Sequence, residues 1–204
     1  MTRRISGVFV LLALSALAFT MGTPALADTV TFSTTGGFSA SGGASSAIFG
    51  SGPNTLTLSY SGIVNSTVGT PTNSSAGFMI ASVLGTGGDA AGTFTLTIDQ
   101  TVPSLGSGGL SGALSGTISE SSSGGTLDFS STTLVLGDVT YTLQQPPGGY
   151  DLVPPTTLNG ETSIQMHIDT STVPEPAFLG LTGLGFFGIV GITFLRNRRL
   201  RVRG

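Results

Sequence analysis

Apolar residues alternate with threonine, serine and other polar residues in short runs through the middle of the chain. In the run TFTLTI (93–98), Phe94, Leu96 and Ile98 share one face. The same alternation occurs in TVTFS (29–33), TLTLSY (55–60), TLDF (126–129), VTYTL (139–143) and SIQMHI (163–168). A period of two predicts β-strands with one apolar face, and threonine suits the solvent face of a sheet.

Segments rich in Gly, Pro, Asn and Ser separate these runs and predict turns. They are GSGPN (50–54), GTGGD (85–89), GSGG (106–109), SSSGG (121–125), QPPGGYD (145–151) and LNGE (158–161). The spacing predicts an all-β domain, an antiparallel β-sandwich or jelly-roll-like fold. The segment 107–125 has the weakest pattern, and we expect an edge strand with a long loop there. Because half of residues 28–173 are Gly, Ser or Thr, a disordered low-complexity stalk is one alternative, and a β-solenoid is another.

The chain begins with a different pattern. Arg3 and Arg4 precede an uncharged, mostly apolar run of 15 residues (5–19), and small residues follow at Ala25 and Ala27. This order predicts a secretory signal peptide over 1–27, with cleavage before Asp28. An uncleaved membrane helix is the alternative, but the run is short for that role.

Near the other end, residues 177–195 carry no charge. At about 1.5 Å per residue a helix of this length reaches roughly 28 Å, close to the thickness of the hydrocarbon layer of a bilayer. Five arginines follow, Arg196, Arg198, Arg199, Arg201 and Arg203. Positive charge is retained on the cytoplasmic side, so this pattern predicts a transmembrane helix (177–195) with a cytoplasmic basic tail (196–204). A buried helix of a soluble domain is the alternative.

The charge distribution narrows the classes of function. Residues 28–173 hold nine of the ten acidic residues and none of the seven basic ones. A region without Lys or Arg cannot neutralise phosphates, so nucleic-acid binding is excluded. The chain contains no cysteine, which also excludes disulfides, thiolate metal sites and cysteine nucleophiles.

Few residues offer catalytic chemistry. His167 is the only histidine, and the chain has no G-x-S-x-G elbow that would expose a serine nucleophile. We therefore expect His167 to be a solvent-facing residue of a strand rather than a catalytic base. Carboxylate pairs could serve a glycosidase, and the candidates are Asp99, Glu120, Asp128, Asp138, Asp151, Glu161 and Asp169. Broad aromatic platforms for sugars are missing, since the chain has no Trp and only three Tyr. We expect no enzyme and no cofactor, with calcium at the loop residues Asp89 or Asp151 as the alternative.

The C-terminal pattern resembles a known sorting signal. Val173-Pro174-Glu175-Pro176, the apolar span and the basic end together resemble the PEP-CTERM signal of exported bacterial proteins, over about 30 residues of segment 173–204. The resemblance implies that Pro174, Glu175 and Pro176 are recognised by an exosortase-like membrane enzyme, in bacteria that make extracellular polysaccharide. The two prolines favour an extended, unpaired segment that such an enzyme could read. A rigid spacer before an anchor helix is the alternative.

These observations predict an exported, non-catalytic protein of the cell surface or extracellular matrix, with residues 28–172 as its β domain. The expected partners are the Sec-type export machinery, the sorting enzyme, the membrane and extracellular polysaccharide. The expected location is the cell envelope or the medium, with a C-terminal anchor that sorting could remove. A carbohydrate- or calcium-binding, lectin-like module is the alternative function.

Overall fold

The computed structural model describes residues 28–171. The predicted signal-peptide helix (1–27) and transmembrane helix (177–195) lie outside these residues. No helix within residues 28–171 is long and apolar enough to cross a membrane.

The described chain is all-β. The long strands are β1 (Thr29–Phe38), β2 (Ser46–Ser51), β3 (Asn54–Gly62), β5 (Thr72–Leu84), β7 (Gly92–Val102), β8 (Gly106–Ser115), β12 (Val139–Leu143) and β14 (Glu161–Thr170). The short strands are β4 (Ser66–Gly69), β6 (Gly88–Asp89), β9 (Thr117–Ile118), β10 (Thr126–Phe129), β11 (Thr133–Leu136) and β13 (Tyr150–Asp151). Two single 3-10 turns complete it, η1 (Ser39–Ser41) and η2 (Leu158–Gly160).

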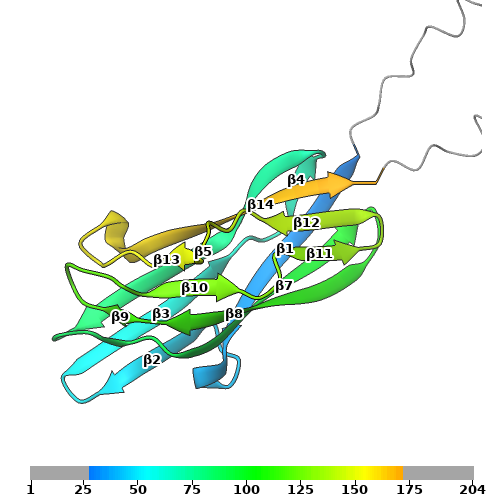
Figure 1. Cartoon of the computed structure of the whole chain (residues 1–204). Helices are drawn as coiled ribbons and strands as arrows, with labels where there is room; N and C mark the ends of the chain where they lie inside the picture. Colours follow the sequence, from blue (N-terminus) through cyan, green and yellow to red (C-terminus); the bar gives the residue numbers. More distant parts are fainter. Residues whose placement is uncertain (1–27, 172–204) are drawn as a thin grey trace, which may run out of the picture.

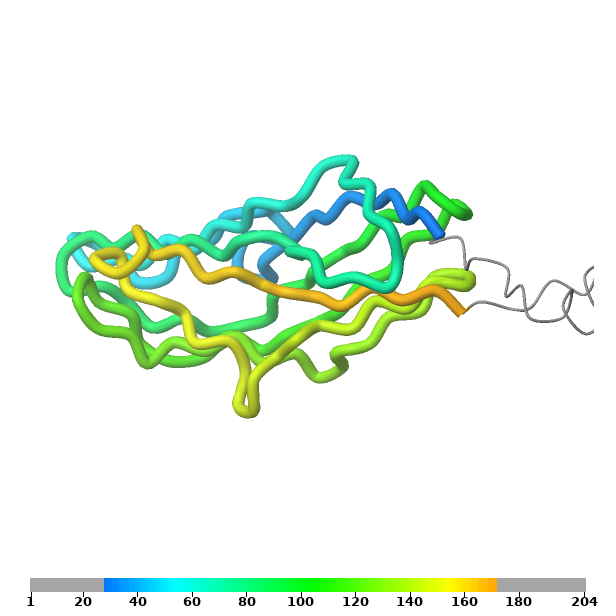
Figure 2. The backbone as a smooth tube through the Cα atoms, turned by 90° about the horizontal axis from the view of Figure 1, so that it is seen from above, coloured from blue at the N-terminus to red at the C-terminus, as the bar shows by residue number. Residues whose placement is uncertain are grey.

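The strands form two curled six-stranded antiparallel sheets that face each other (Figures 1 and 2), an arrangement consistent with a β-sandwich. The first sheet has the order β13-β10-β8-β7-β1-β4 and the second has the order β11-β12-β14-β5-β3-β2. Strands β6 and β9 form a separate two-stranded ladder. The prediction of an all-β domain is confirmed, and the described residues form neither a stalk nor a solenoid.

All six predicted strand runs lie in strands, and their apolar faces form the core between the sheets. Phe94 is fully buried at the centre of a group of rings. Its ring centroid is 5.1 Å from those of Phe38 and Tyr60, and 6.3 Å from that of Phe129. The alternation of Thr with apolar residues therefore separates solvent from core as expected.

The expectation for segment 107–125 is wrong in part. Strand β8 is ten residues long and lies inside its sheet, between β7 and β10, rather than at an edge. Its inward positions include Gly108 and Gly112, where a Cβ would lie 2.7 Å from Leu134 Cδ1 and 2.8 Å from Leu127 Cδ1 respectively. These glycines leave room for leucines of neighbouring strands, so the strand helps to line the core while its sequence lacks large apolar residues there.

Hydrogen bonds made by polar side chains link the two sheets through the core. Thr34 Oγ1 donates to Ala76 O at 2.6 Å, and the Tyr60 hydroxyl contacts both of these oxygens. On the other side of the core, the Tyr141 hydroxyl donates to Gln100 Oε1 at 2.9 Å. Within the described residues every buried side-chain nitrogen and oxygen has a hydrogen-bond partner, as a dry interior requires.

Burial raises the pKa of Tyr60, Tyr141 and Tyr150 to about 12. In the unfolded chain a tyrosine has a pKa of about 10, so the unfolded state releases protons first as the pH rises. The stability contributed by the neutral tyrosines is therefore complete below about pH 10 and is lost as the pH rises towards about 12. Residues 28–171 contain no Lys or Cys, the other side chains that titrate near this pH range, so the change in stability between about pH 10 and about pH 12 reports on the tyrosines.

We expect the urea midpoint of the full-length chain in mild detergent to fall steadily between about pH 10 and about pH 12. Tyr141→Phe should be less stable at neutral pH, because Gln100 Oε1 loses a donor, but its midpoint should depend less on pH. A midpoint that stays constant over this range, or an unchanged pH dependence in Tyr141→Phe, would contradict this assignment.

The first and last described strands meet at one end of the molecule. Thr70 N donates to Asp28 O at 2.9 Å, and the hydroxyls of Thr70 and Thr170 are 2.8 Å apart. The beginning of β1 and the end of β14 thus lie side by side, while the β2–β3 hairpin lies at the opposite end (Figure 1).

Candidate functional site

Most of the residues predicted to act in export and sorting lie outside the described residues. These are Ala25, Ala27, Val173, Pro174, Glu175, Pro176, Arg196, Arg198, Arg199, Arg201 and Arg203. Asp28, the predicted first residue after signal cleavage, is the first described residue and is exposed.

His167 lies on the outer face of β14, as its alternation with Ile168 predicts. Its Nδ1 is 2.8 Å from Asn73 Oδ1, and the same oxygen accepts a hydrogen bond from Gln144 Nε2 at 2.9 Å. An amide oxygen can hold the imidazole in one orientation, but it supplies neither a nucleophile nor a negative charge. Among residues 28–171 the ring of His167 is hydrogen-bonded to this amide and to no hydroxyl, so no nucleophile is paired with it there.

The candidate carboxylates are distributed over several elements. Asp99 on β7 accepts a hydrogen bond from Ser107 at 2.6 Å, and Asp128 on β10 accepts one from Gln145 at 2.7 Å. Asp89 on β6 accepts one from the Thr117 hydroxyl. No group of three or more His, Asp or Glu side chains that could hold a metal ion occurs in residues 28–171.

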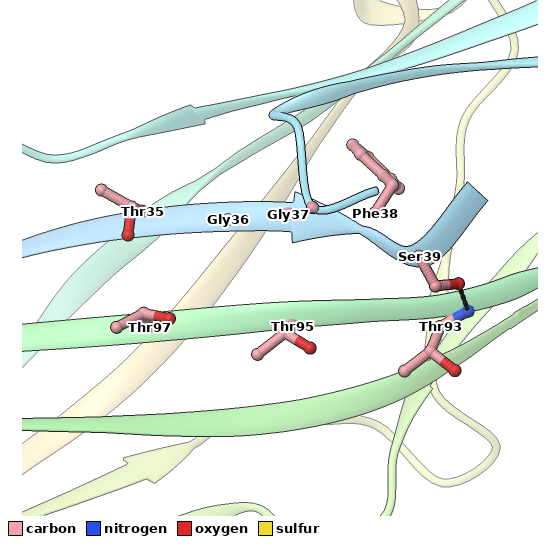
Figure 3. Close-up of a pocket in the computed structure, with 9 residues that line it drawn as sticks. Thr35, Gly36, Gly37, Phe38, Ser39, Thr93, Thr95 and Thr97 are labelled. Atoms are coloured by element: carbon pink, nitrogen blue, oxygen red, sulfur yellow. Dashed lines mark hydrogen bonds between the residues drawn. The ribbon is translucent and has the colours of Figure 1, made fainter. Parts of the chain in front are cut away.

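A groove lies on the outer face of the first sheet, over β1 and β7 near η1, with a volume of about 410 Å³. We call it the threonine groove; it is lined by Thr35, Gly36, Gly37, Phe38, Ser39, Gly43, Thr93, Thr95 and Thr97. The strand register sets Thr35 opposite Thr97 and Gly37 opposite Thr95. Figure 3 shows these threonines side by side on the two strands.

Two glycines in β1 shape this groove. A Cβ at Gly36 would lie 2.5 Å from both Phe94 Cζ and Tyr60 Cδ1, so the core rings occupy the space under this residue. A Cβ at Gly37 would meet the carbonyl oxygen of Gly43, which belongs to the loop that follows η1. Gly36 therefore leaves room for the core rings on the inner side, and the absence of a side chain at Gly37 lets the loop approach β1 on the outer side, beside the threonine row.

The hydroxyls of the groove differ in how they are used. Ser39 Oγ accepts a hydrogen bond from Thr93 N at 2.9 Å and fixes η1 to β7 (Figure 3). Thr95 Oγ1 is 3.4 Å from Ser111 Oγ, a weak contact. Within residues 28–171, the hydroxyls of Thr35, Thr93 and Thr97 bond to no protein atom, so each can donate to or accept from a ligand.

The sequence pattern did not predict the threonine groove. The neighbouring Thr34, Thr35, Gly36 and Gly37 were visible, but the register that sets β7 beside them is a long-range feature. The three tyrosines contribute nothing to this surface, because each is at most 7 % exposed.

Comparison of the chain with known protein families, with curated proteins and with solved structures finds no match.

Proposed function

We propose that this chain is an exported, non-catalytic protein of the cell surface or extracellular matrix, sorted through its C-terminal segment (173–204). The observation that carries this proposal is the placement of charge. All seven basic residues lie in the first four and the last nine positions, and the 146 residues between Asp28 and Val173 have none. Arginines flanking apolar segments are topological signals, and a region without them is free to cross the membrane.

The positions of the chain ends support this topology. Because Asp28 and Thr170 are both held to Thr70, removal of the signal peptide leaves the new N-terminus beside the segment that leads to the anchor. The β2–β3 hairpin then lies at the end of the domain furthest from the membrane (Figure 1). Export would use a Sec-type machinery, and the segment Val173-Pro174-Glu175-Pro176 would meet an exosortase-like enzyme at the membrane surface.

The chemistry of the described surface supports a non-catalytic role. The one histidine is held by Asn73, and the exposed face of the first sheet presents threonine and serine hydroxyls with few charges. A hydroxyl-rich, cation-free surface suits contact with water and neutral polymers of an extracellular matrix better than acid–base chemistry.

Fractionation of cells that produce the full-length chain tests the proposal. We expect the protein in the cell-surface or extracellular fraction of a bacterium that has an exosortase, and in the membrane fraction of the same strain without that enzyme. Recovery of the complete chain from the cytoplasm of both strains would contradict export. Hydrolysis of a glycan by the protein would contradict the non-catalytic role.

The threonine groove favours a second candidate function, binding of a neutral saccharide. Its volume of about 410 Å³ lies within the range of about 300–1,000 Å³ typical of small-molecule sites. The free hydroxyls of Thr35 and Thr97 match the hydroxyls of a sugar, and the lining residues carry no charge. Calcium gains no comparable support from the described residues.

Removal of the hydroxyls that face each other across the two strands, those of Thr35 and Thr97, tests this second function. If the groove binds a neutral glycan on an array, Thr35→Val combined with Thr97→Val should weaken binding about tenfold or more, because hydrogen bonds of about 0.5–1.5 kcal/mol each are lost. Thr133→Val, an equal change at an exposed position on the other sheet, should leave binding unchanged. Equal binding by both variants would place any glycan site elsewhere.

A further inference from the structure

The second sheet ends at β2, which pairs with β3 on one side. Tyr60 N donates to Ser45 O at 2.8 Å, and the register sets Ala47 opposite Leu58. Hydrogen-bonded pairs alternate along an antiparallel ladder, so the backbone groups of Ser46 and Ile48 point away from β3. Within the described residues no other strand takes up these donors and acceptors.

The other three edge strands are short or covered. Strand β4 has four residues and is followed closely by Pro71, and β13 has two residues and carries Asp151. Beyond β13, the Gln145 side chain accepts from Phe129 N at 2.7 Å and so occupies the edge of β10. Strand β11 also has only four residues. Strand β2 has six residues, without a charge or a proline, so it lacks the features that usually block pairing at an edge.

The side chains on this edge are also suited to contact. Ile48 lies on the outer face of β2 and is 68 % exposed. Leu84 is on the same face of the sheet, on β5 beyond β3, and is 61 % exposed. An isoleucine at the centre of a free edge strand favours strand addition, because both its backbone and its apolar side chain lack a partner.

Electrostatics directs self-association to this edge. With nine carboxylates and no Lys or Arg in 28–173, two copies of the domain repel each other over most of their surface. Residues 29–88, which contain β2, β3 and β5, hold no charged residue at all. The one carboxylate on a strand beside β2 is Asp89 of β6, which is hydrogen-bonded to Thr117.

We propose that the free edge of β2 pairs with the same edge of a second copy of this chain, in antiparallel orientation about a two-fold axis through Ile48. In this arrangement Ile48 lies opposite Ile48 of the second copy, and Ser46 lies opposite Gly50. The two second sheets join into one continuous sheet, and the chain ends, which lie at the other end of each domain, stay free (Figure 1).

A charge at the axis tests the pairing. In sedimentation of the full-length chain in mild detergent, the wild type should show a concentration-dependent dimer. Ile48→Lys should raise the dimer dissociation constant at least about tenfold, because two like charges then face each other across the axis. Val135→Lys is the matched control, since Val135 on the edge strand β11 is 59 % exposed, and it should dimerise as the wild type does.

Cross-linking gives a second, geometric test. The chain has no cysteine, so Ile48→Cys introduces a single thiol. Opposite residues of a hydrogen-bonded pair have Cα atoms about 5.5 Å apart, within the disulfide range of about 4.4–6.8 Å. Ile48→Cys should form a disulfide-linked dimer under mild oxidation, and Val135→Cys should cross-link at least about tenfold more slowly. A monomeric wild type, a dimer unaffected by Ile48→Lys, or equal cross-linking at both positions would overturn the proposal.

Discussion

Replacement of Phe94 by alanine is expected to lower the free energy of unfolding by about 3–5 kcal/mol. Phe94 is fully buried, and its ring packs against those of Phe38, Tyr60 and Phe129. Truncation removes these ring contacts and leaves a cavity between the sheets. Because domains of this size are stable by about 5–15 kcal/mol, a large part of the total stability depends on this one side chain.

Chemical denaturation of the full-length chain in mild detergent, followed by circular dichroism, measures this loss. Phe78→Ala is the matched control, because Phe78 is only half-buried, on the outer face of β5. It should cost roughly 1 kcal/mol. Equal losses for the two variants would contradict the assignment of Phe94 to the centre of the core.

Under the proposed sorting, replacement of Pro174, Glu175 and Pro176 by alanine is expected to reduce release of the protein strongly. Proline lacks a backbone donor and favours an extended chain, so the sequence Pro174-Glu175-Pro176 predicts an extended segment in which Glu175 is the one charged residue. Alanine favours a helical backbone and carries no charge, so three alanines would remove both of these features. We expect the amount of released protein, measured by immunoblot of the medium, to fall at least about tenfold. An enzyme that recognises polar groups of its substrate discriminates strongly against a substrate that lacks them.

Pro154 and Pro155 provide the control for this prediction. They form a second pair of prolines, in the loop before η2, and their replacement by alanine leaves the sorting segment intact. Release of this control variant should equal that of the wild type. Undiminished release after the change at 174–176 would show that the triplet is only a spacer.

Local alternation was sufficient to predict six of the strands that form the core. Runs such as TFTLTI set an apolar side chain at every second position, and this rule depends only on the geometry of a single strand. The same runs identified the inward faces of β1, β3, β7, β10, β12 and β14.

Other strands could not be predicted because their patterns depend on neighbouring strands. In β5, Ala76 and Gly77 are both buried, and the register with β14 shifts between Ile164 and Gln165, so the alternation along the sequence is interrupted. In β8, glycines stand at inward positions because leucines of other strands fill the space. Both the bulge in β5 and the filling of β8 by leucines depend on residues far away in the sequence, so a local pattern cannot predict them.

The candidate sites differ in the same way. The proposed sorting motif is contiguous in the sequence and needs no fold to be recognised, although its residues lie outside those that the structure describes. The threonine groove depends on the register of Thr35 with Thr97 and on the approach of Gly43 to Gly37. The free edge of β2 depends on the order of strands in the second sheet, which alternation alone does not determine.

The most direct test of export and sorting is the intact mass of the protein recovered from a bacterium that has an exosortase. We predict a mature species outside the cell that begins at Asp28 and ends near Val173–Pro176, without the arginines that close the chain. A species that keeps Arg196–Arg203 and stays in the membrane fraction would contradict removal of a sorting signal. It would identify the C-terminal segment as a permanent anchor.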